Sequence, residues 1–153
     1  MIEKLPGADD REARLIVNEI RMGLFDNPIA TKILDPILQA REDLLGRTNA
    51  PLVVRSSALV EDREGSTFAG QFESFLGLAD EKEFLTAVRA CWAALWSVRA
   101  LRYMGAHAID PSSTAMALLI QPLIDAVSSG GGLSQTAEGG MILSATWGLG
   151  EAI

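Results

Sequence analysis

One short run of residues constrains the fold of this chain more than any other. Residues 52–57 read LVVRSS, in which Leu52, Val53 and Val54 are contiguous, as in a strand that is buried on both faces. Arg55 follows directly, and a guanidinium keeps its charge inside a protein. The run therefore predicts a core strand that ends where a cation must pair with a carboxylate, reach water or meet an anionic ligand.

Helical and extended segments surround this strand. Apolar residues recur at helical spacing in four segments, namely 9–25, 29–45, 80–95 and 97–105. Further strands are expected at residues 71–78, 114–124 and 139–148. This order predicts an α/β or α+β domain in which helices flank a mixed sheet.

Two local signals refine the ends of the helices. Asp9 or Asp10 can cap the first helix, and Asp80 can cap the third. Pro36 interrupts the second segment, which either kinks there or restarts with Asp35 as its cap.

The composition excludes several classes of protein. The 153 residues are 48% apolar with a net charge of −7, which allows a real core but argues against binding nucleic acid or an anionic membrane. Cys91 and His107 are the only residues of their types, so an internal disulfide and a multi-histidine metal site are excluded. We find no signal peptide and no apolar run of ~18 residues, so we expect a cytoplasmic protein without a membrane span.

The residues after Arg55 suit an anionic ligand. Two serines follow it directly, and residues 65–70 form a loop with two glycines and two further hydroxyls. A forked cation, hydroxyls and approachable backbone amides are what a polyphosphate requires. Neither a P-loop nor a G-x-G-x-x-G motif is present. The alternative is a purely structural pairing of Arg55 with Glu61, Asp62 or another carboxylate, in which the loop is only a hairpin.

Four segments match, in order, the motifs of a known family. They are residues 53–78, 91–104, 117–124 and 142–153, and the first contains VVRSS, an acidic ED turn and TFAGQ. Together they resemble the nucleotide-binding domain of the phosphoenolpyruvate synthase and pyruvate phosphate dikinase family. Rifampin phosphotransferase and phenylphosphate synthase carry similar domains. The resemblance covers roughly residues 15–153.

The resemblance implies an ATP-grasp fold, in which two lobes close on ATP. This chain would be an incomplete version, with residues 1–122 as the N-terminal lobe and residues 123–153 as the start of the second lobe. The run SSGGGLS at residues 128–134 reads as a connection, and it could be a lobe boundary, a hairpin or a mobile phosphate lid.

The resemblance also implies a reaction. Members of the family pass phosphate from ATP to a histidine on a separate swivelling domain, which then phosphorylates pyruvate or another small acceptor. Arg55 would hold the phosphates as the catalytic cation, the loop would cover them, and the exit of the strand at residues 117–124 would meet the adenine. The residues so implied in binding ATP are Arg55, Ser56, Thr67, Phe68, Ala69, Gly70, Gln121, Pro122, Leu123 and Glu151.

Two parts of the family pattern have no match in this sequence. The glycine-rich segment with a phosphate-binding lysine is not found, and the segment that supplies the Mg²⁺ ligands would lie beyond Ile153. We therefore expect the chain alone to be inactive and to need the remaining phosphotransferase domains as partners. The alternative is a non-catalytic regulatory or assembly subunit with a degenerate half of the fold.

Three other aromatic or imidazole side chains have competing interpretations. His107 lies outside any phosphocarrier motif, so we interpret it as structural. Trp92 lies on the apolar stripe of its helix and is expected in the core, whereas Trp147 suits either a ligand stacker or the core.

Overall fold

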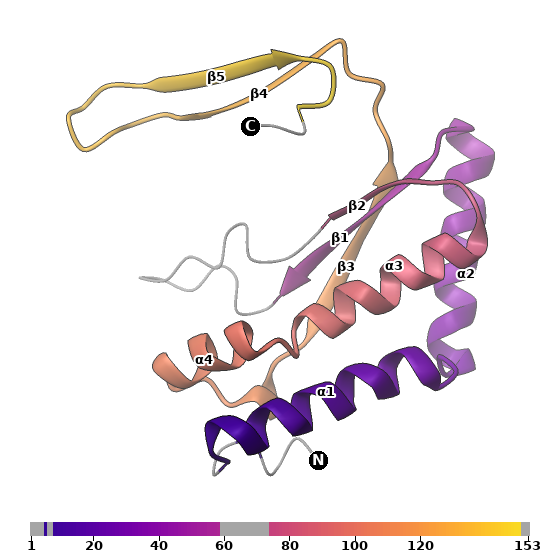
Figure 1. Ribbon diagram of the computed structural model, residues 1–153. Helices are drawn as coiled ribbons and strands as arrows, with labels where there is room; N and C mark the ends of the chain where they lie inside the picture. Colours follow the sequence, from indigo (N-terminus) through magenta and orange to yellow (C-terminus); the bar gives the residue numbers. More distant parts are fainter. Residues whose placement is uncertain (1–4, 6–7, 59–73, 151–153) are drawn as a thin grey trace. The chain divides into compact units, whose positions relative to one another are not determined.

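The chain divides into two compact units, Met1–Leu123 and Ile124–Ile153. The computed structural model describes residue 5 and residues 8–58 and 74–150 (Figure 1). The elements of unit 1 are α1 (Asp10–Asp26), α2 (Thr31–Thr48), β1 (Leu52–Ala58), β2 (Ser74–Leu78), α3 (Glu81–Ala94), α4 (Val98–Ala106), a 3-10 turn (Pro111–Ser113) and β3 (Met116–Pro122). Those of unit 2 are β4 (Ser128–Leu133) and β5 (Ile142–Trp147). Whether the units are the two lobes of an ATP-grasp domain stays a prediction.

The sheet of unit 1 has the strand order β2-β1-β3. β1 is the central strand, and Arg55 lies between Ser74 of β2 and Leu119 of β3. The combination of helices and strands confirms the expected fold class, and the described strand pairs are antiparallel rather than mixed.

One face of this sheet is covered by α3. Leu52 and Val54 of β1 pack against Phe84, Val88 and Cys91 of that helix, and all five side chains are at most 1% exposed. Figure 1 shows α3 along the sheet with α1 beside it, and the two helices are in contact. The contiguous apolar run at the start of β1 thus forms the core that the sequence predicts.

The apolar stretch Glu81–Ala106 is long and apolar enough to cross a membrane by length and composition alone. It is two helices rather than one, because α4 starts anew after Ser97, whose hydroxyl accepts a hydrogen bond from the Ala100 amide at 3.1 Å. Phe84, Val88 and Cys91 of this stretch are in the core described above, and Leu95, Ala100 and Met104 are buried in a second cluster. Trp92 also lies beside that core, as predicted.

Side-chain caps fix the helix starts. Asp9 accepts hydrogen bonds from the amides of Arg11 and Glu12 at 2.9 and 2.8 Å, so Asp9 is the cap of α1. Asp80 accepts one from the Glu83 amide at 2.7 Å, which confirms it as the cap of α3. These bonds satisfy backbone donors that a helix cannot satisfy itself.

The alternative that the second helix restarts at Pro36 is wrong. α2 begins at Thr31 after Ala30 and continues through Pro36, so Asp35 is not a cap. Proline removes one backbone hydrogen bond, but Ile37 and the leucines further along the helix pack against the core of unit 1. This packing holds the helix together across the proline.

The glycine-rich run is a strand and not an irregular connection. β4 pairs with β5 in an antiparallel hairpin, which is one of the three alternatives that the sequence left open. A Cβ at Gly130 would lie 2.5 Å from the Ser144 carbonyl oxygen, and one at Gly132 would lie 2.7 Å from that of Ile142. Glycine is therefore required here by the close approach of β5.

Candidate functional site

The second face of the sheet in unit 1 is open around Arg55. Side chains alternate along a strand, so Val53, Arg55 and Ser57 share one face, and their cross-strand neighbours on β3 share it too. Arg55 and Ser57 are exposed, and Leu119, opposite Arg55, is 50% exposed. This face is the reverse of the one that α3 covers.

The burial of β1 changes abruptly along this face. Val53 is only 5% exposed, whereas Arg55 is exposed. Beyond this step lies a hollow of about 440 Å³, lined by residues 55–57 of β1 and 117–119 of β3. β1 is therefore buried on both faces up to Val54, and its exposed part begins at Arg55, where the sequence predicts the end of the core strand.

Arg55 has no ion-pair or hydrogen-bond partner for its side chain among residues 8–58 and 74–150. The structural alternative from the sequence names Glu61 and Asp62 as partners, and both lie outside the described residues. An exposed guanidinium beside an open hollow is accessible to an anion from solvent, and it can bind phosphate oxygens in a bidentate geometry.

The two serines after Arg55 lie on different faces. Ser56 is the strand neighbour of Arg55, so its side chain is directed to the opposite face, with Leu118 across from it. Ser57 shares the face of Arg55 and is exposed. Both serines line the hollow, and the two-residue period of the strand places only the Ser57 side chain on the face of Arg55. The predicted role of Ser56 stays a prediction.

The residues at the exit of β3 have few main-chain donors available for an adenine. Gln121 lies opposite Val53 and therefore on the face of Arg55. The backbone amide of Leu123 donates to the Pro51 carbonyl at 2.7 Å, and Pro122 has no N–H. Neither Pro122 nor Leu123 has a main-chain donor left for an adenine, whereas the side-chain amide of Gln121 can both donate and accept.

Five of the predicted ATP-binding residues lie outside the described part of the chain. They are Thr67, Phe68, Ala69, Gly70 and Glu151. Their roles, like those of the other predicted site residues, stay predictions.

Unit 2 exposes its tryptophan. Trp147 is 85% exposed and lines a hollow with Ser128, Ala145 and Thr146. It does not belong to a buried core of this unit, so the alternative of a ligand stacker stays open as a prediction.

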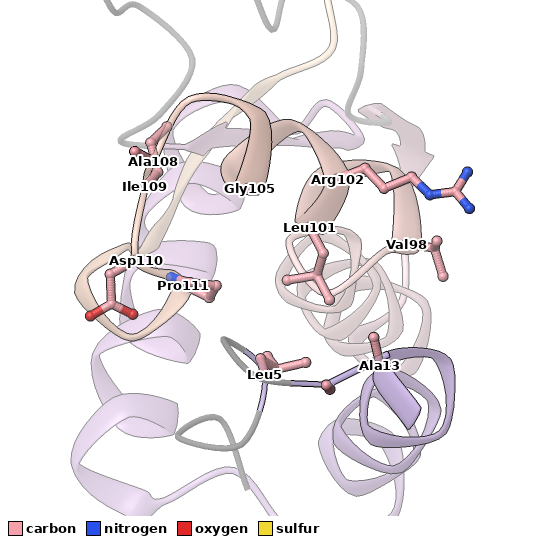
Figure 2. A pocket seen from close by; sticks show the side chains of 11 residues that line it. Leu5, Ala13, Val98, Leu101, Arg102, Gly105, Ala108, Ile109, Asp110 and Pro111 are labelled. Atoms are coloured by element: carbon pink, nitrogen blue, oxygen red, sulfur yellow. The ribbon is translucent and has the colours of Figure 1, made fainter. Parts of the chain in front are cut away.

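Another cavity of unit 1 lies away from Arg55. It has a volume of about 600 Å³ and lies between α4, the start of α1 and the turn after α4 (Figure 2). Figure 2 shows the side chains of Arg102 and Asp110 pointing away from its apolar walls. The Ser112 hydroxyl and then the Ser112 amide bind the Asp110 carboxylate and lower its pKa. Without convergent polar groups, this cavity does not suit a phosphate.

The described residues offer no cluster of three histidine, cysteine, aspartate or glutamate side chains that could hold a metal. His107 stacks on the Tyr103 ring at 4.0 Å, and its Nδ1 lies 2.9 Å from the Tyr103 carbonyl oxygen. This contact within one helical turn supports the structural interpretation of His107.

The sequence comparison decides the family. Residues 2–153 match the family model described as pyruvate phosphate dikinase, AMP/ATP-binding domain. The chain belongs to this family. The resemblance seen in the motifs is thereby confirmed over almost the entire chain.

Curated relatives agree with this assignment. A probable phosphoenolpyruvate synthase of Methanothermobacter thermautotrophicus is 30% identical over 100% of this chain and 23% of its own length. The phosphoenolpyruvate synthase of Aeropyrum pernix is 37% identical over 72% of this chain and 14% of its own length. A prodigiosin synthesizing transferase of Serratia marcescens is 35% identical over 68% and 12%, respectively. The chain therefore spans less than a quarter of the length of these relatives.

Proposed function

We propose that this chain forms an ATP-binding wall of a dikinase-type phosphotransferase, with Arg55 as the cation that holds the phosphates. The observation that carries the proposal is the exposed Arg55 guanidinium beside an open hollow, without a partner among the described residues. Membership of an AMP/ATP-binding family supports a nucleotide as the anion.

The chemistry follows from the groups on this face. The guanidinium of Arg55 neutralises phosphate charge and orients two oxygens through its forked donors. Ser57 adds a hydroxyl on the same face, and Leu119 lies across from Arg55. Because phosphoryl transfer depends mainly on positioning and on neutralising charge, these groups would contribute to catalysis by holding ATP in place.

The remaining parts of the site complete this proposal. The loop Thr67–Gly70 would cover the phosphates, Gln121 and the carbonyls at the exit of β3 would meet the base, and Glu151 would support the site. Mg²⁺ would take its ligands from a segment outside this chain, as the family resemblance implies, and the part of the chain that the structure describes holds no cluster of three candidate ligands.

The proposed reaction passes phosphate from ATP through a phosphohistidine on a swivelling domain to a small acceptor. That domain and the rest of the phosphotransferase would be the partners of this chain, in the cytoplasm. Pyruvate is the acceptor that the relatives named phosphoenolpyruvate synthase suggest. The similar prodigiosin synthesizing transferase argues that this domain alone does not select the acceptor.

The test is a titration of ATP monitored by backbone NMR, which detects millimolar binding. Wild type is compared with Arg55→Ala and with Arg47→Ala, an exposed arginine at the end of α2. Loss of a charge-assisted phosphate contact costs about 1.5–3 kcal/mol, or roughly 10- to 150-fold in Kd. Arg47→Ala is expected to bind like wild type. Equal binding by Arg55→Ala and wild type would contradict the role of Arg55, and no binding by wild type would contradict the ATP wall.

A second candidate function is a non-catalytic regulatory or assembly subunit. The observation that favours it is the exposed apolar surface of unit 2, where Leu143 is 76% and Trp147 is 85% exposed. Such side chains are more often found at protein interfaces than on the free surface. Binding of this chain to the other phosphotransferase domains, without any binding of ATP, would favour this function.

A further inference from the structure

One side of α1 is apolar and faces solvent, although the helix already has a buried side. Ile16 and Val17 pack inward against Trp96 and Leu101. On the outer side, Leu15 and Met22 are each 64% exposed, and Phe25 is 43% exposed. Leu15, Met22 and Phe25 form what we call the outer seam. Their spacing of seven and then three residues is that of a coiled-coil seam.

Charges flank the outer seam asymmetrically. With about 100° of rotation per helical residue, Arg14 and Arg21 follow one edge of the seam, and Glu19 and Asp26 follow the other. All four side chains are exposed. None forms a salt bridge with another residue in the described part of the chain. The proposed ATP wall uses neither these charges nor the seam.

We propose that the outer seam is a self-association surface, at which two copies of this chain pair with their α1 helices parallel and in register. In this arrangement Arg14 of each copy faces Glu19 of the other, and Arg21 faces Asp26, because residues five apart meet across a parallel seam. Two-fold symmetry doubles each pair. Antiparallel helices would instead bring arginines against arginines and carboxylates against carboxylates. The charges along the two edges therefore select the parallel orientation, in which Arg11, in line with Leu15 and Met22, faces Arg11 of the second copy.

The middle of the seam supports the same register. Asn18 lies between Leu15 and Met22 on the outer side and is exposed. In the parallel pair its amide meets the Asn18 amide of the second copy, and the two can hydrogen-bond. A single asparagine in such a seam specifies register at some cost in affinity. Because Ile16 and Val17 lie on the reverse side of α1, the folded bodies of the two copies extend away from each other.

The dimer is expected to be weak, because α1 has only 17 residues and the seam has three apolar side chains. Sedimentation equilibrium of the whole chain should therefore extend to about 1 mM, where a millimolar Kd is still measurable. Wild type is expected to dimerise reversibly. A monomer at every concentration would overturn the proposal and would leave a different polypeptide as the occupant of the seam.

Two sets of variants test the seam and its orientation. Met22→Glu should abolish the dimer, whereas Ile33→Glu, at an exposed apolar residue of α2, should not. R14E/R21E should weaken dimerisation by about tenfold or more, because it replaces all four ion pairs by repulsion. Adding E19R/D26R exchanges the two charged edges and should restore wild-type association. Far-UV circular dichroism checks that each variant is folded.

The charge exchange decides the orientation. In a parallel dimer the quadruple variant R14E/R21E/E19R/D26R regains all four ion pairs. In an antiparallel dimer the same variant has like charges against each other on both edges, as the wild type would. Failure of the added substitutions to restore association, or a dimer that survives Met22→Glu, would overturn the proposal.

Discussion

The two faces of the sheet in unit 1 are built from the same strands, and yet around Arg55 they differ in burial and in polarity. On the covered face, Leu52 and Val54 are completely buried under α3. On the open face, Arg55 is exposed and Leu119 is half exposed. A sheet with one covered face obtains its stability from that face, so the other face can carry polar chemistry. Stability and ATP binding should therefore respond to different substitutions.

The largest effect is expected on the covered face. Phe84→Ala removes a fully buried ring from the interface of α3 and the sheet, and it should lower the free energy of unfolding by about 3–5 kcal/mol. Leu119→Ala on the open face should change it by less than about 1 kcal/mol. Urea unfolding followed by circular dichroism measures both values. Similar losses for the two variants would show that the open face is part of the core.

A carboxylate introduced on the open face should weaken ATP binding much more than it changes the stability. In Leu119→Glu the new side chain lies across from Arg55 and can pair with it, as in cross-strand ion pairs. ATP binding should weaken by about tenfold, or 1.4 kcal/mol, while the stability changes by about 0.5 kcal/mol or less. Leu119→Gln is the uncharged control. Unchanged ATP affinity in the glutamate variant would argue against phosphates beside Arg55.

Loss of the cap of α3 should lower the stability of the chain and leave ATP binding unchanged, because α3 packs on the covered face. Asp80→Ala removes the bond to the Glu83 amide and should cost about 1 kcal/mol of stability without changing ATP binding. Asp35→Ala is a matched control, because Asp35 is exposed within α2 and caps no helix. Equal losses in urea unfolding for both variants would contradict the assignment of the caps.

The smallest effect concerns Asp110, which precedes β3 and belongs to neither face. The Ser112 hydroxyl and amide stabilise its charged form, so the pKa of Asp110 in the folded chain is below the ordinary value. Its contribution to stability is complete above the ordinary aspartate pKa and is lost as the pH falls through the lowered folded pKa. Carbon NMR of the carboxyl group should show this, and Ser112→Ala should raise the pKa. A titration at the ordinary value in wild type would contradict the prediction.

Much of unit 1 could be predicted from local patterns. The contiguous apolar residues of β1, the helical spacing of α3 and the aspartates before α1 and α3 act within a few residues, so the sequence displays them directly. The exposure of Arg55 agrees with one of the outcomes that the sequence leaves open, because a charged side chain at the end of a buried run must pair, reach water or meet an anion.

Other features depend on contacts between distant residues and could not be predicted. A run of glycines predicts a connection when only its neighbours in sequence are considered. The close approach of β5 explains why Gly130 and Gly132 lie in a strand instead. Packing of α2 on the core overrides the local signal of Pro36. The different faces of Ser56 and Ser57, by contrast, follow from the two-residue period of a strand and can be read from the sequence.

The central claim is that Arg55 on the open face contacts the phosphates of ATP. The most direct measurement follows the side-chain Nε–H resonance of Arg55 by NMR, assigned by its absence in Arg55→Lys, during titration with ATP and, separately, with AMP. We expect ATP to shift this resonance strongly in a saturable manner and AMP to shift it much less, because AMP lacks the terminal phosphates. An Arg55 resonance that does not move while other residues report ATP binding would contradict the claim.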